Sequence, residues 1–236
     1  PYYEVPTIQK MLINKANAAS IPVITATQML LSMTKSERAT RAEISDVANA
    51  VLDGTDVVML SEESAIGDDP INVVDTMSNI ITQTEYIYDF QKQEKLECSD
   101  DFDVIQSSVT KLADSLGAAG ILALTSSGKS AIKMSRFRPR VPILAFAHKK
   151  KTLSALTTAW GVTPIETIKE AQASKMIQKM LKALEHRDLL DLKGPYITTI
   201  GYPVGVPGST NTIKILNEDE INYYLNLKEQ KKKFNL

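Results

Sequence analysis

The chain has 236 residues, of which 43% are hydrophobic and 23% are charged, and its formal net charge is −1. A chain this close to neutral lacks the positive field that nucleic-acid binding normally needs, and no apolar run approaches the roughly 20 residues of a membrane span. The single cysteine, Cys98, excludes an internal disulfide and is typical of a reducing, cytoplasmic compartment. With only two isolated histidines, His148 and His186, no cysteine/histidine metal cluster is expected.

The first third of the chain predicts a strand–helix–strand unit. Residues 23–29 and 57–60 are short, apolar and largely β-branched, as buried strands are. Between them, Thr40-Arg41-Ala42-Glu43 is a capping box that opens a helix, and Gly54 is placed to end it. Pro6 and Pro70 suit the first turns of two further helices, the second running to about residue 88. Both strands end in polar residues, and in parallel α/β folds ligands bind at that end.

The rest of the chain predicts a second α/β series after a break in composition. Residues 89–101 are polar and without a period, which indicates a linker. Strands are then expected at 121–124, 141–147, 162–166, 196–200 and 212–216, with helices between them, so we predict an open parallel or mixed sheet covered on both faces. We divide the chain into a first domain (1–88), a linker (89–101), a second domain (102–216) and a tail (217–236) with one short helix. Because the chain begins at Pro1 without a methionine, we expect it to be a piece of a longer protein.

Polar side chains at the two early strand ends are candidates for chemistry. The hydroxyl of Thr27, beside Gln28, could contact a bound anion or pass a proton through water; alternatively, Thr27 is simply a β-branched strand residue. Ser61 precedes two adjacent carboxylates, Glu62 and Glu63, whose repulsion could raise one pKa. The residues alone favour the simpler interpretation, a solvated loop with acidic residues near a helix start.

Two arginines flank the capping box. Arg38 and Arg41 could clamp a phosphate or carboxylate, or pair across a subunit interface. An ordinary surface charge is the more common fate of such residues, and no metal site is predicted around them.

The segment from Thr125 to Ser130 follows a buried strand and precedes a helix, which is a favourable place for an anion. Gly128-Lys129-Ser130 matches the end of a nucleotide-binding P-loop, but that motif needs a glycine where Ala123 stands, so a P-loop is excluded. A site for a phosphate monoester and a plain serine-rich capping turn both remain open. The glycine-rich stretch 201–209 could close over the same ligand.

Several of these motifs together resemble the pyruvate kinase family. The first half carries Thr25-Ala26-Thr27-Gln28-Met29-Leu30, the capping box, a run over 45–54 and Met59-Leu60-Ser61. The second half carries the 125–130 loop, Arg136-Phe137-Arg138-Pro139, Trp160-Gly161-Val162 and Gly208-Ser209-Thr210-Asn211-Thr212. The resemblance covers nearly the whole chain up to about Leu216.

The resemblance implies a fold and an activity. It implies that residues 1–88 are the terminal portion of a (β/α)8 barrel and that an open mixed α/β sandwich domain follows. The family transfers phosphoryl from phosphoenolpyruvate to ADP, giving pyruvate and ATP, with magnesium or manganese and usually potassium. Homo-oligomers, tetramers in the complete enzyme, are expected, with neither nucleic acid nor membrane as a partner.

The resemblance also implies roles for single residues. Thr27 would lie beside the enolpyruvate carbon that is protonated, Ser61 near the proton-relay waters, and Arg38 and Arg41 in a subunit contact. A phosphorylated sugar or nucleoside monophosphate effector would bind at a loop made of Thr125, Ser126, Ser127, Gly128, Lys129 and Ser130, closed by a segment with Pro207, Gly208 and Ser209.

The chain departs from the family in two ways. Glu62 and Ser64 stand where the family usually has glycine and threonine, and Ala39 replaces a usual proline. The barrel strands that would supply the catalytic lysine and the metal-binding carboxylates are absent from this sequence. We therefore expect a C-terminal fragment that is inactive by itself; the alternative is a non-catalytic effector-binding regulatory module.

Overall fold

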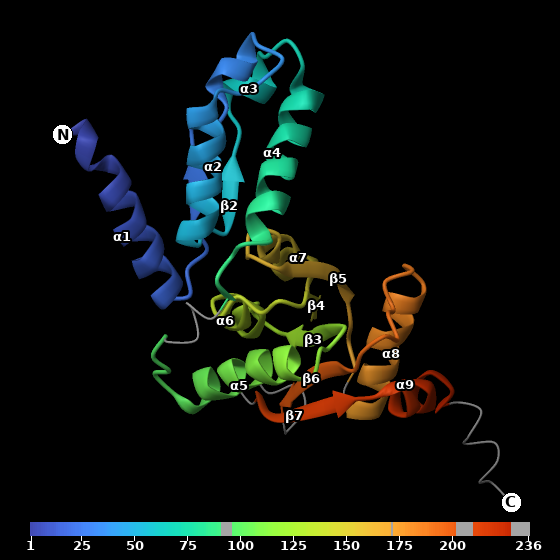
Figure 1. Cartoon of the computed structure of the whole chain (residues 1–236). Helices are drawn as coiled ribbons and strands as arrows, with labels where there is room; N and C mark the ends of the chain where they lie inside the picture. The colour runs from blue at the N-terminus through green and yellow to red at the C-terminus, as the bar shows by residue number, and fades with distance from the viewer. Residues whose placement is uncertain (91–95, 171, 202–209, 228–236) are drawn as a thin grey trace, which may run out of the picture. The chain divides into compact units, whose positions relative to one another are not determined.

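The computed structural model describes residues 1–90, 96–170, 172–201 and 210–227, and the chain folds as two compact units, Pro1–Lys92 and Gln93–Leu236 (Figure 1). Each unit is α/β in content, as predicted, and each is described by itself. In the described residues, no helix combines the length and the apolar character that crossing a membrane would need.

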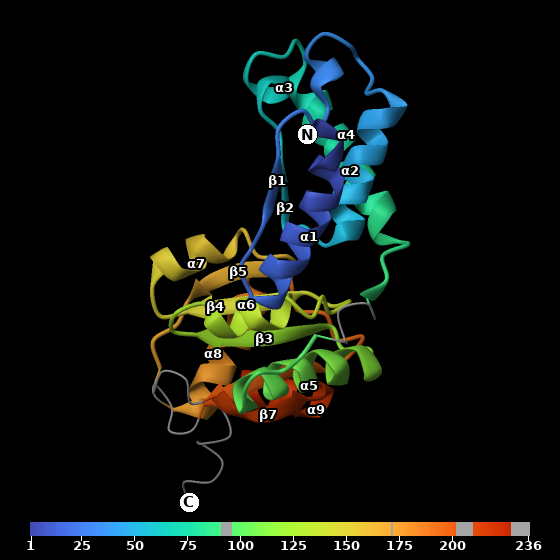
Figure 2. The same cartoon turned by 90° about the vertical axis from the view of Figure 1, so that its left-hand side faces the viewer.

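The first unit alternates helices with two strands. Figure 2 shows the two strands side by side with the long helices to one side of them. The strands are parallel, with Ile24 opposite Val57 and Ala26 opposite Met59. The elements are η1 (Tyr2–Glu4), α1 (Val5–Ala18), β1 (Ile24–Ala26), η2 (Leu31–Thr34), α2 (Arg41–Asp53), β2 (Val57–Met59), α3 (Glu62–Ala65) and α4 (Pro70–Glu85).

Helix α2 begins and ends where the sequence predicts. The Thr40 hydroxyl accepts a hydrogen bond from the Glu43 N–H, and the Glu43 carboxylate accepts one from the Thr40 N–H at 2.8 Å, which completes the capping box. Gly54 caps the other end with a left-handed φ of 98°, a conformation that glycine adopts without strain. The helix buries Val47 and Ala50 against a cluster from η2, α4 and the segment after β1.

Two expectations for this unit need correction. The first strand, predicted over 23–29, ends at Ala26, because Thr27 and Gln28 adopt positive φ angles that no strand can continue through. The stretch after β2, interpreted as a solvated loop, is instead the short helix α3, and Glu63 is buried within it.

The second unit is an open five-stranded sheet with the order β5-β4-β3-β6-β7. The first four strands are parallel and β7 runs antiparallel to β6, so the predicted mixed sheet is confirmed. The elements are α5 (Asp101–Ser115), β3 (Gly120–Thr125), α6 (Lys129–Ser135), β4 (Ile143–Ala147), α7 (Lys150–Leu156), β5 (Val162–Thr167), α8 (Ala173–Glu185), β6 (Tyr196–Gly201), β7 (Thr210–Leu216) and α9 (Glu218–Leu225).

Helices cover both faces of this sheet, as expected. Residues of α5 and α6 form one apolar cluster with alternate residues of β3 and β4, and α8 and α9 form a second cluster on the other face. Ile221 of α9 is fully buried in that second cluster. The part of the predicted tail that forms α9 therefore packs into the core of the unit.

Candidate functional site

The segment after β1 carries the most unusual backbone of the first unit. Thr27 has φ 72° and Gln28 has φ 55°, both in the left-handed region. For a β-branched residue such as Thr27 this conformation is a genuine outlier, and such strain tends to occur at functional sites. Both side chains are exposed at the carboxyl end of the strand, so the Thr27 hydroxyl is accessible for chemistry.

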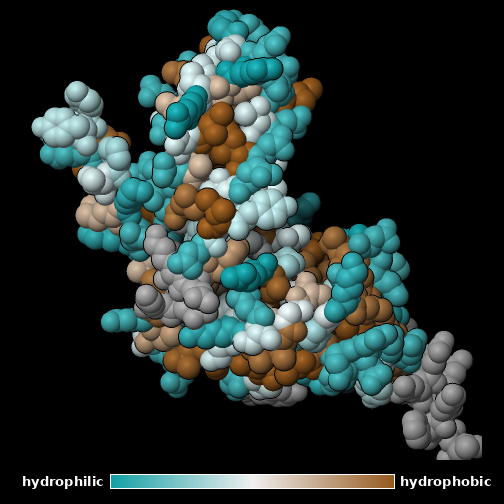
Figure 3. Space-filling view, in the orientation of Figure 1, coloured by the Kyte–Doolittle hydropathy of each residue, from teal (hydrophilic) through white to brown (hydrophobic). Residues whose placement is uncertain are grey.

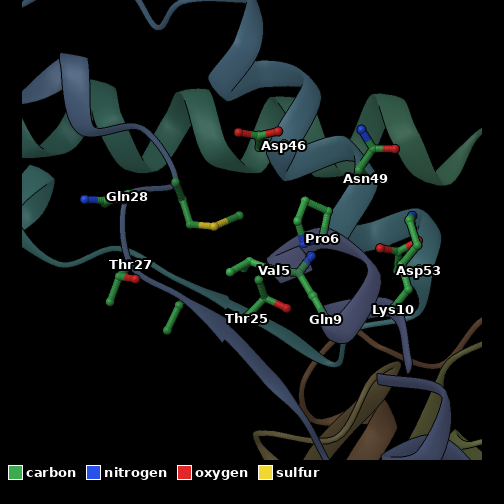
Figure 4. A pocket seen from close by; sticks show the side chains of 12 residues that line it. Val5, Pro6, Gln9, Lys10, Thr25, Thr27, Gln28, Asp46, Asn49 and Asp53 are labelled. Atoms are coloured by element: carbon green, nitrogen blue, oxygen red, sulfur yellow. The ribbon is translucent and has the colours of Figure 1, made fainter. Parts of the chain in front are cut away.

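A cavity of about 360 Å³ lies between α1, α2 and the end of β1 (Figure 4). In Figure 4 the side chain of Gln28 points away from the cluster formed by Gln9, Lys10 and Thr25. An ion pair between Lys10 and the largely buried Asp53 closes one end. The sequence analysis did not single out these residues. The lining consists of Val5, Pro6, Gln9, Lys10, Thr25, Ala26, Thr27, Gln28, Met29, Asp46, Asn49 and Asp53.

Ser61 stands at the carboxyl end of β2, two residues after Met59, which pairs with Ala26 at the end of β1. Because the two strands are parallel neighbours, Thr27 and Ser61 lie at the same edge of the sheet. Ser61 does not belong to the described lining of the cavity that contains Thr27. The structure thus brings the two candidate residues to one edge, with only Thr27 facing the cavity.

Glu63 is buried, whereas the sequence favoured a solvated loop at this position. Its side chain is fully buried, at 0% exposure, and its carboxylate accepts hydrogen bonds from the N–H groups of Leu30 at 3.1 Å and Ser61 at 2.7 Å. Burial acts to raise the pKa of Glu63, but backbone N–H groups, above all that of Ser61, lower it more. The pKa therefore lies below its usual range, so Glu63 is not the carboxylate whose pKa repulsion could have raised.

A second carboxylate fixes the segment after β1 from the α2 side. Glu43 accepts hydrogen bonds from the Ser32 N–H at 2.6 Å and from the Thr40 N–H and hydroxyl, both at 2.8 Å. Burial opposes these bonds, but they prevail and hold the pKa of Glu43 below its usual range. The capping box was predicted; its additional bond to Ser32 was not.

Arg38 and Arg41, the predicted interface residues, flank Thr40 and are both exposed. The Arg38 backbone N–H donates to the Ser36 hydroxyl at 3.2 Å, which in turn donates to the Arg38 carbonyl at 2.8 Å. These bonds hold the backbone at residues 36–38 in a tight turn. The exposure of both arginines is compatible with a surface charge and with a contact to another subunit.

In the second unit, the predicted phosphate loop stands at the carboxyl end of β3. The buried Thr125 hydroxyl accepts a hydrogen bond from the Gly128 N–H at 2.9 Å, so this hydroxyl is used within the loop. Gly128 has φ 91°, a conformation that favours glycine. The Thr152 hydroxyl donates to the Ser126 carbonyl at 3.4 Å and ties the loop to α7. Ser127 is exposed and Ser130 is buried.

Lys129, the predicted cation of this loop, is exposed. Its Nζ atom lies 5.7 Å from the centre of the Phe102 ring on α5. This distance fits a cation–π contact, which orders the side chain without neutralising its charge. Pro207, Gly208 and Ser209, the residues predicted to close over the ligand, fall outside the described residues.

Comparisons with known proteins match both units. The family model "Pyruvate kinase, barrel domain" matches residues 1–74, and "Pyruvate kinase, alpha/beta domain" matches residues 103–216. The chain belongs to the pyruvate kinase family. It is 41% identical over 215 residues to pyruvate kinase 2 of Synechocystis, 40% identical over 220 residues to pyruvate kinase of Clostridium acetobutylicum, and 41% identical over 219 residues to pyruvate kinase of Geobacillus stearothermophilus.

Each of these three matches covers 91% of this chain but only 36%, 46% and 37% of the respective pyruvate kinase. The chain therefore spans about two fifths of the length of the curated relatives it matches. The family resemblance predicted from the motifs is confirmed, and so is the assignment of the two parts to barrel and α/β regions of a pyruvate kinase.

The metals that the pyruvate kinase resemblance implies can be tested against the donor groups on this chain. Within the described ranges, no three carboxylate, histidine or cysteine side chains gather closely enough to hold a metal ion. Glu63, the one buried carboxylate at the strand ends, is already engaged by two backbone N–H groups. The described residues therefore do not fit a resident divalent ion.

Proposed function

We propose that this chain forms the C-terminal part of a pyruvate kinase, which transfers phosphoryl from phosphoenolpyruvate to ADP and yields pyruvate and ATP. One observation carries the proposal: a threonine in a strained left-handed turn and a serine lie at the ends of two parallel strands, inside the region that matches the barrel domain. Ligands of parallel α/β folds bind at this edge.

Two residues have roles in the proposed reaction. Thr27 presents an exposed hydroxyl beside the cavity and would stand next to the enolpyruvate carbon that gains a proton. Ser61 at the adjacent strand end would order the waters that deliver this proton. A hydroxyl can accept one hydrogen bond while it donates another, so it can pass a proton without becoming an ion itself.

We further propose that the polypeptide alone does not catalyse the transfer. Phosphoryl transfer depends on positioning and on neutralising the charge of the transferred group, for which the family uses a lysine, magnesium or manganese, and potassium. The described residues do not fit a divalent ion, so no step is assigned to a metal here. These groups would come from barrel strands outside this sequence.

A coupled assay that follows pyruvate formation tests both points. The chain alone should give only background turnover. A chimera in which this chain replaces the matched region of the Geobacillus stearothermophilus relative should be active, and Thr27→Ala should lower its kcat by about 10²–10⁴, the usual range for lost proton transfer. Thr7→Ala on α1 is the matched control and should leave kcat unchanged. A chimera whose activity ignores Thr27→Ala would contradict the proposed role.

A second proposal concerns the 125–130 loop. We propose that this loop binds the phosphate group of an effector, which is a sugar phosphate or a nucleoside monophosphate. The residues of the proposed site are Thr125, Ser126, Ser127, Gly128, Lys129 and Ser130. The exposure of Ser127 and Lys129, which flank the left-handed Gly128, supports this proposal. If the chimera is inactive but the chain binds such a ligand, the regulatory-module alternative is favoured.

The remaining proposals follow from the family alone. A homo-oligomer, tetrameric in the complete enzyme, with Arg38 and Arg41 at a subunit contact, agrees with the exposure of both arginines. A cytoplasmic location agrees with the single, exposed cysteine.

A further inference from the structure

Glu63 joins the segment after β2, in which it lies, to Leu30, which is 33 residues earlier in the sequence. One carboxylate oxygen, Oε1, accepts the Leu30 N–H at 3.1 Å, and the other, Oε2, accepts the Ser61 N–H at 2.7 Å. Leu30 follows the left-handed pair of Thr27 and Gln28, and Ser61 follows β2. One buried carboxylate therefore contacts both strand ends that carry the proposed reactive hydroxyls.

The turn at Thr27 and Gln28 needs an anchor on its far side. The left-handed region is unfavourable for a residue other than glycine, which keeps that conformation only when the surroundings over-determine it. On the near side, β1 pairs with β2 up to Ala26. On the far side, Leu30 is fully buried and its N–H is bound by Glu63. The turn is thus held at both ends.

The segment that carries Glu63 packs closely on itself and is tied to the segment after β1. The backbone of Gly67 approaches the Glu63 carbonyl so closely that a Cβ on residue 67 would clash with the Glu63 carbonyl oxygen. Just beyond, the Asp68 N–H donates to the Thr34 carbonyl at 3.1 Å, and the Asp68 carboxylate pairs with Lys35 at 2.8 Å. The two contacts of Asp68, together with the Leu30–Glu63 hydrogen bond, therefore connect the segment after β1 to the segment after β2.

We propose that Glu63 is a positioning residue that sets the Thr27 turn and Ser61 relative to one another at the strand ends. The proposal rests on the proposed roles of Thr27 and Ser61 in proton transfer. The two N–H groups bond different oxygens of the Glu63 carboxylate, an arrangement that a side-chain amide, with its single oxygen, does not reproduce. Its neighbour Glu62 has the same charge and the same helix but an exposed side chain, which makes it the matched control.

The test is solution NMR on the full chain with Glu63→Gln, Glu63→Asp and Glu62→Gln. Glutamine keeps the shape but offers one acceptor oxygen and an NH₂ group that cannot accept the second N–H. We expect amide exchange at Leu30 and Ser61 to speed up at least about tenfold in Glu63→Gln, and the HN–Hα couplings of Thr27 and Gln28 to move away from left-handed values. Glu63→Asp should shift the same signals less, and Glu62→Gln should leave them unchanged.

These readouts do not depend on turnover, so they decide the proposal even if the chimera is inactive. If the chimera is active, Glu63→Gln should lower kcat about tenfold while KM for phosphoenolpyruvate stays within twofold. Unchanged couplings at Thr27 and Gln28 in Glu63→Gln would overturn the proposal. It would equally be overturned if exchange rose alike at every amide of the first unit, or if both Glu63 variants unfolded that unit, because Glu63 would then serve stability alone.

Discussion

Lys133 of α6 and Asp103 of α5 form an ion pair in which the Asp103 side chain is only 1% exposed. The same carboxylate accepts hydrogen bonds from the Ser99 N–H at 3.1 Å and the Ser99 hydroxyl at 2.7 Å, and Arg136 approaches it to 3.6 Å. This cluster connects two helices to the chain that enters the second unit. Because the cluster is buried, the loss of one partner leaves a charge that its remaining neighbours compensate only in part.

Asp103→Asn should therefore destabilise the second unit strongly. Asparagine keeps the size of the side chain but removes the nearer counter-ion of the Lys133 ammonium and leaves it, among the described residues, only Asp100, whose carboxylate lies 3.7 Å away. Breaking a buried ion pair by removing one partner typically costs about 3–5 kcal/mol. Urea denaturation followed by signals of the second unit measures the effect. Asp101→Asn, an exposed acidic residue in the same helical turn, is the control and should change the free energy of unfolding by less than about 0.5 kcal/mol. Equal effects in both variants would contradict this account.

The same carboxylate predicts how stability depends on pH. Burial acts to raise the pKa of Asp103, but the bond to Lys133, the bonds to Ser99 and the nearby Arg136 lower it to about 2. Since the folded-state pKa lies below the ordinary value near 3.8, the unfolded chain binds the proton first as pH falls. The contribution, on the order of 2 kcal/mol, is present above about pH 4 and disappears as pH falls towards 2.

Unfolding measured between pH 2 and pH 6 checks this prediction. The wild-type second unit should lose stability below pH 4 more steeply than Asp103→Asn, which has no carboxylate to titrate at this position. If the two proteins lose stability in parallel over this range, Asp103 does not carry the predicted share of the pH dependence.

The sequence predicts those features whose signals are local. Thr40, Glu43 and Gly54 are within one helix, and their capping pattern determines where α2 begins and ends. Alternation of apolar strands and helices is likewise enough to predict the mixed sheet of the second unit.

The sequence does not predict features that need a distant partner. Glu63 looks like a solvated acidic residue until Leu30, 33 positions earlier, supplies an N–H to its buried carboxylate. Asp103 looks like an ordinary acidic residue of a helix start until Lys133 is placed beside it. The left-handed turn at Thr27 is hidden for the same reason, because a β-branched residue after a strand normally continues it.

Self-association is expected from the apolar surface of the first unit. Half-exposed apolar side chains lie on α1, β1 and β2, and they include Ile8, Met11, Leu12, Ile24 and Met59. Figure 3 shows apolar residues on the surface of the first unit. A two-stranded parallel sheet with open edges also offers unpaired N–H and C=O groups to another chain. We expect light scattering to show a mass that rises with concentration above that of the 26.0 kDa monomer.

A pair of variants on α1 localises this association. Leu12→Glu places a charge on the apolar side of the helix, where Leu12 is 53% exposed, and should shift the equilibrium towards monomer. Lys15→Glu changes an exposed charged residue of the same helix and should have a smaller effect. A strictly monomeric wild type at high concentration would refute the prediction.

The last prediction concerns Lys129 and the proposed effector phosphate. Its Nζ atom, 5.7 Å from the Phe102 ring, is exposed, so its charge is available to a ligand at the 125–130 loop. Lys129→Ala should weaken the binding of a sugar phosphate or nucleoside monophosphate by about 1.5–3 kcal/mol, the range for hydrogen bonds to charged groups. Binding should also weaken with added salt, because part of the attraction acts between charges.

Calorimetry with a panel of sugar phosphates and nucleoside monophosphates measures this effect on the full chain. Lys111→Ala, an exposed lysine of α5, is the control and should bind like wild type. Phe102→Leu keeps an apolar contact but removes the ring face on which the Lys129 ammonium lies, so that ammonium becomes less ordered. This variant should therefore weaken binding, but less than Lys129→Ala does. If Lys129→Ala and wild type bind equally, the loop is not the site; if no ligand of the panel binds, the loop is a capped turn without a phosphate role.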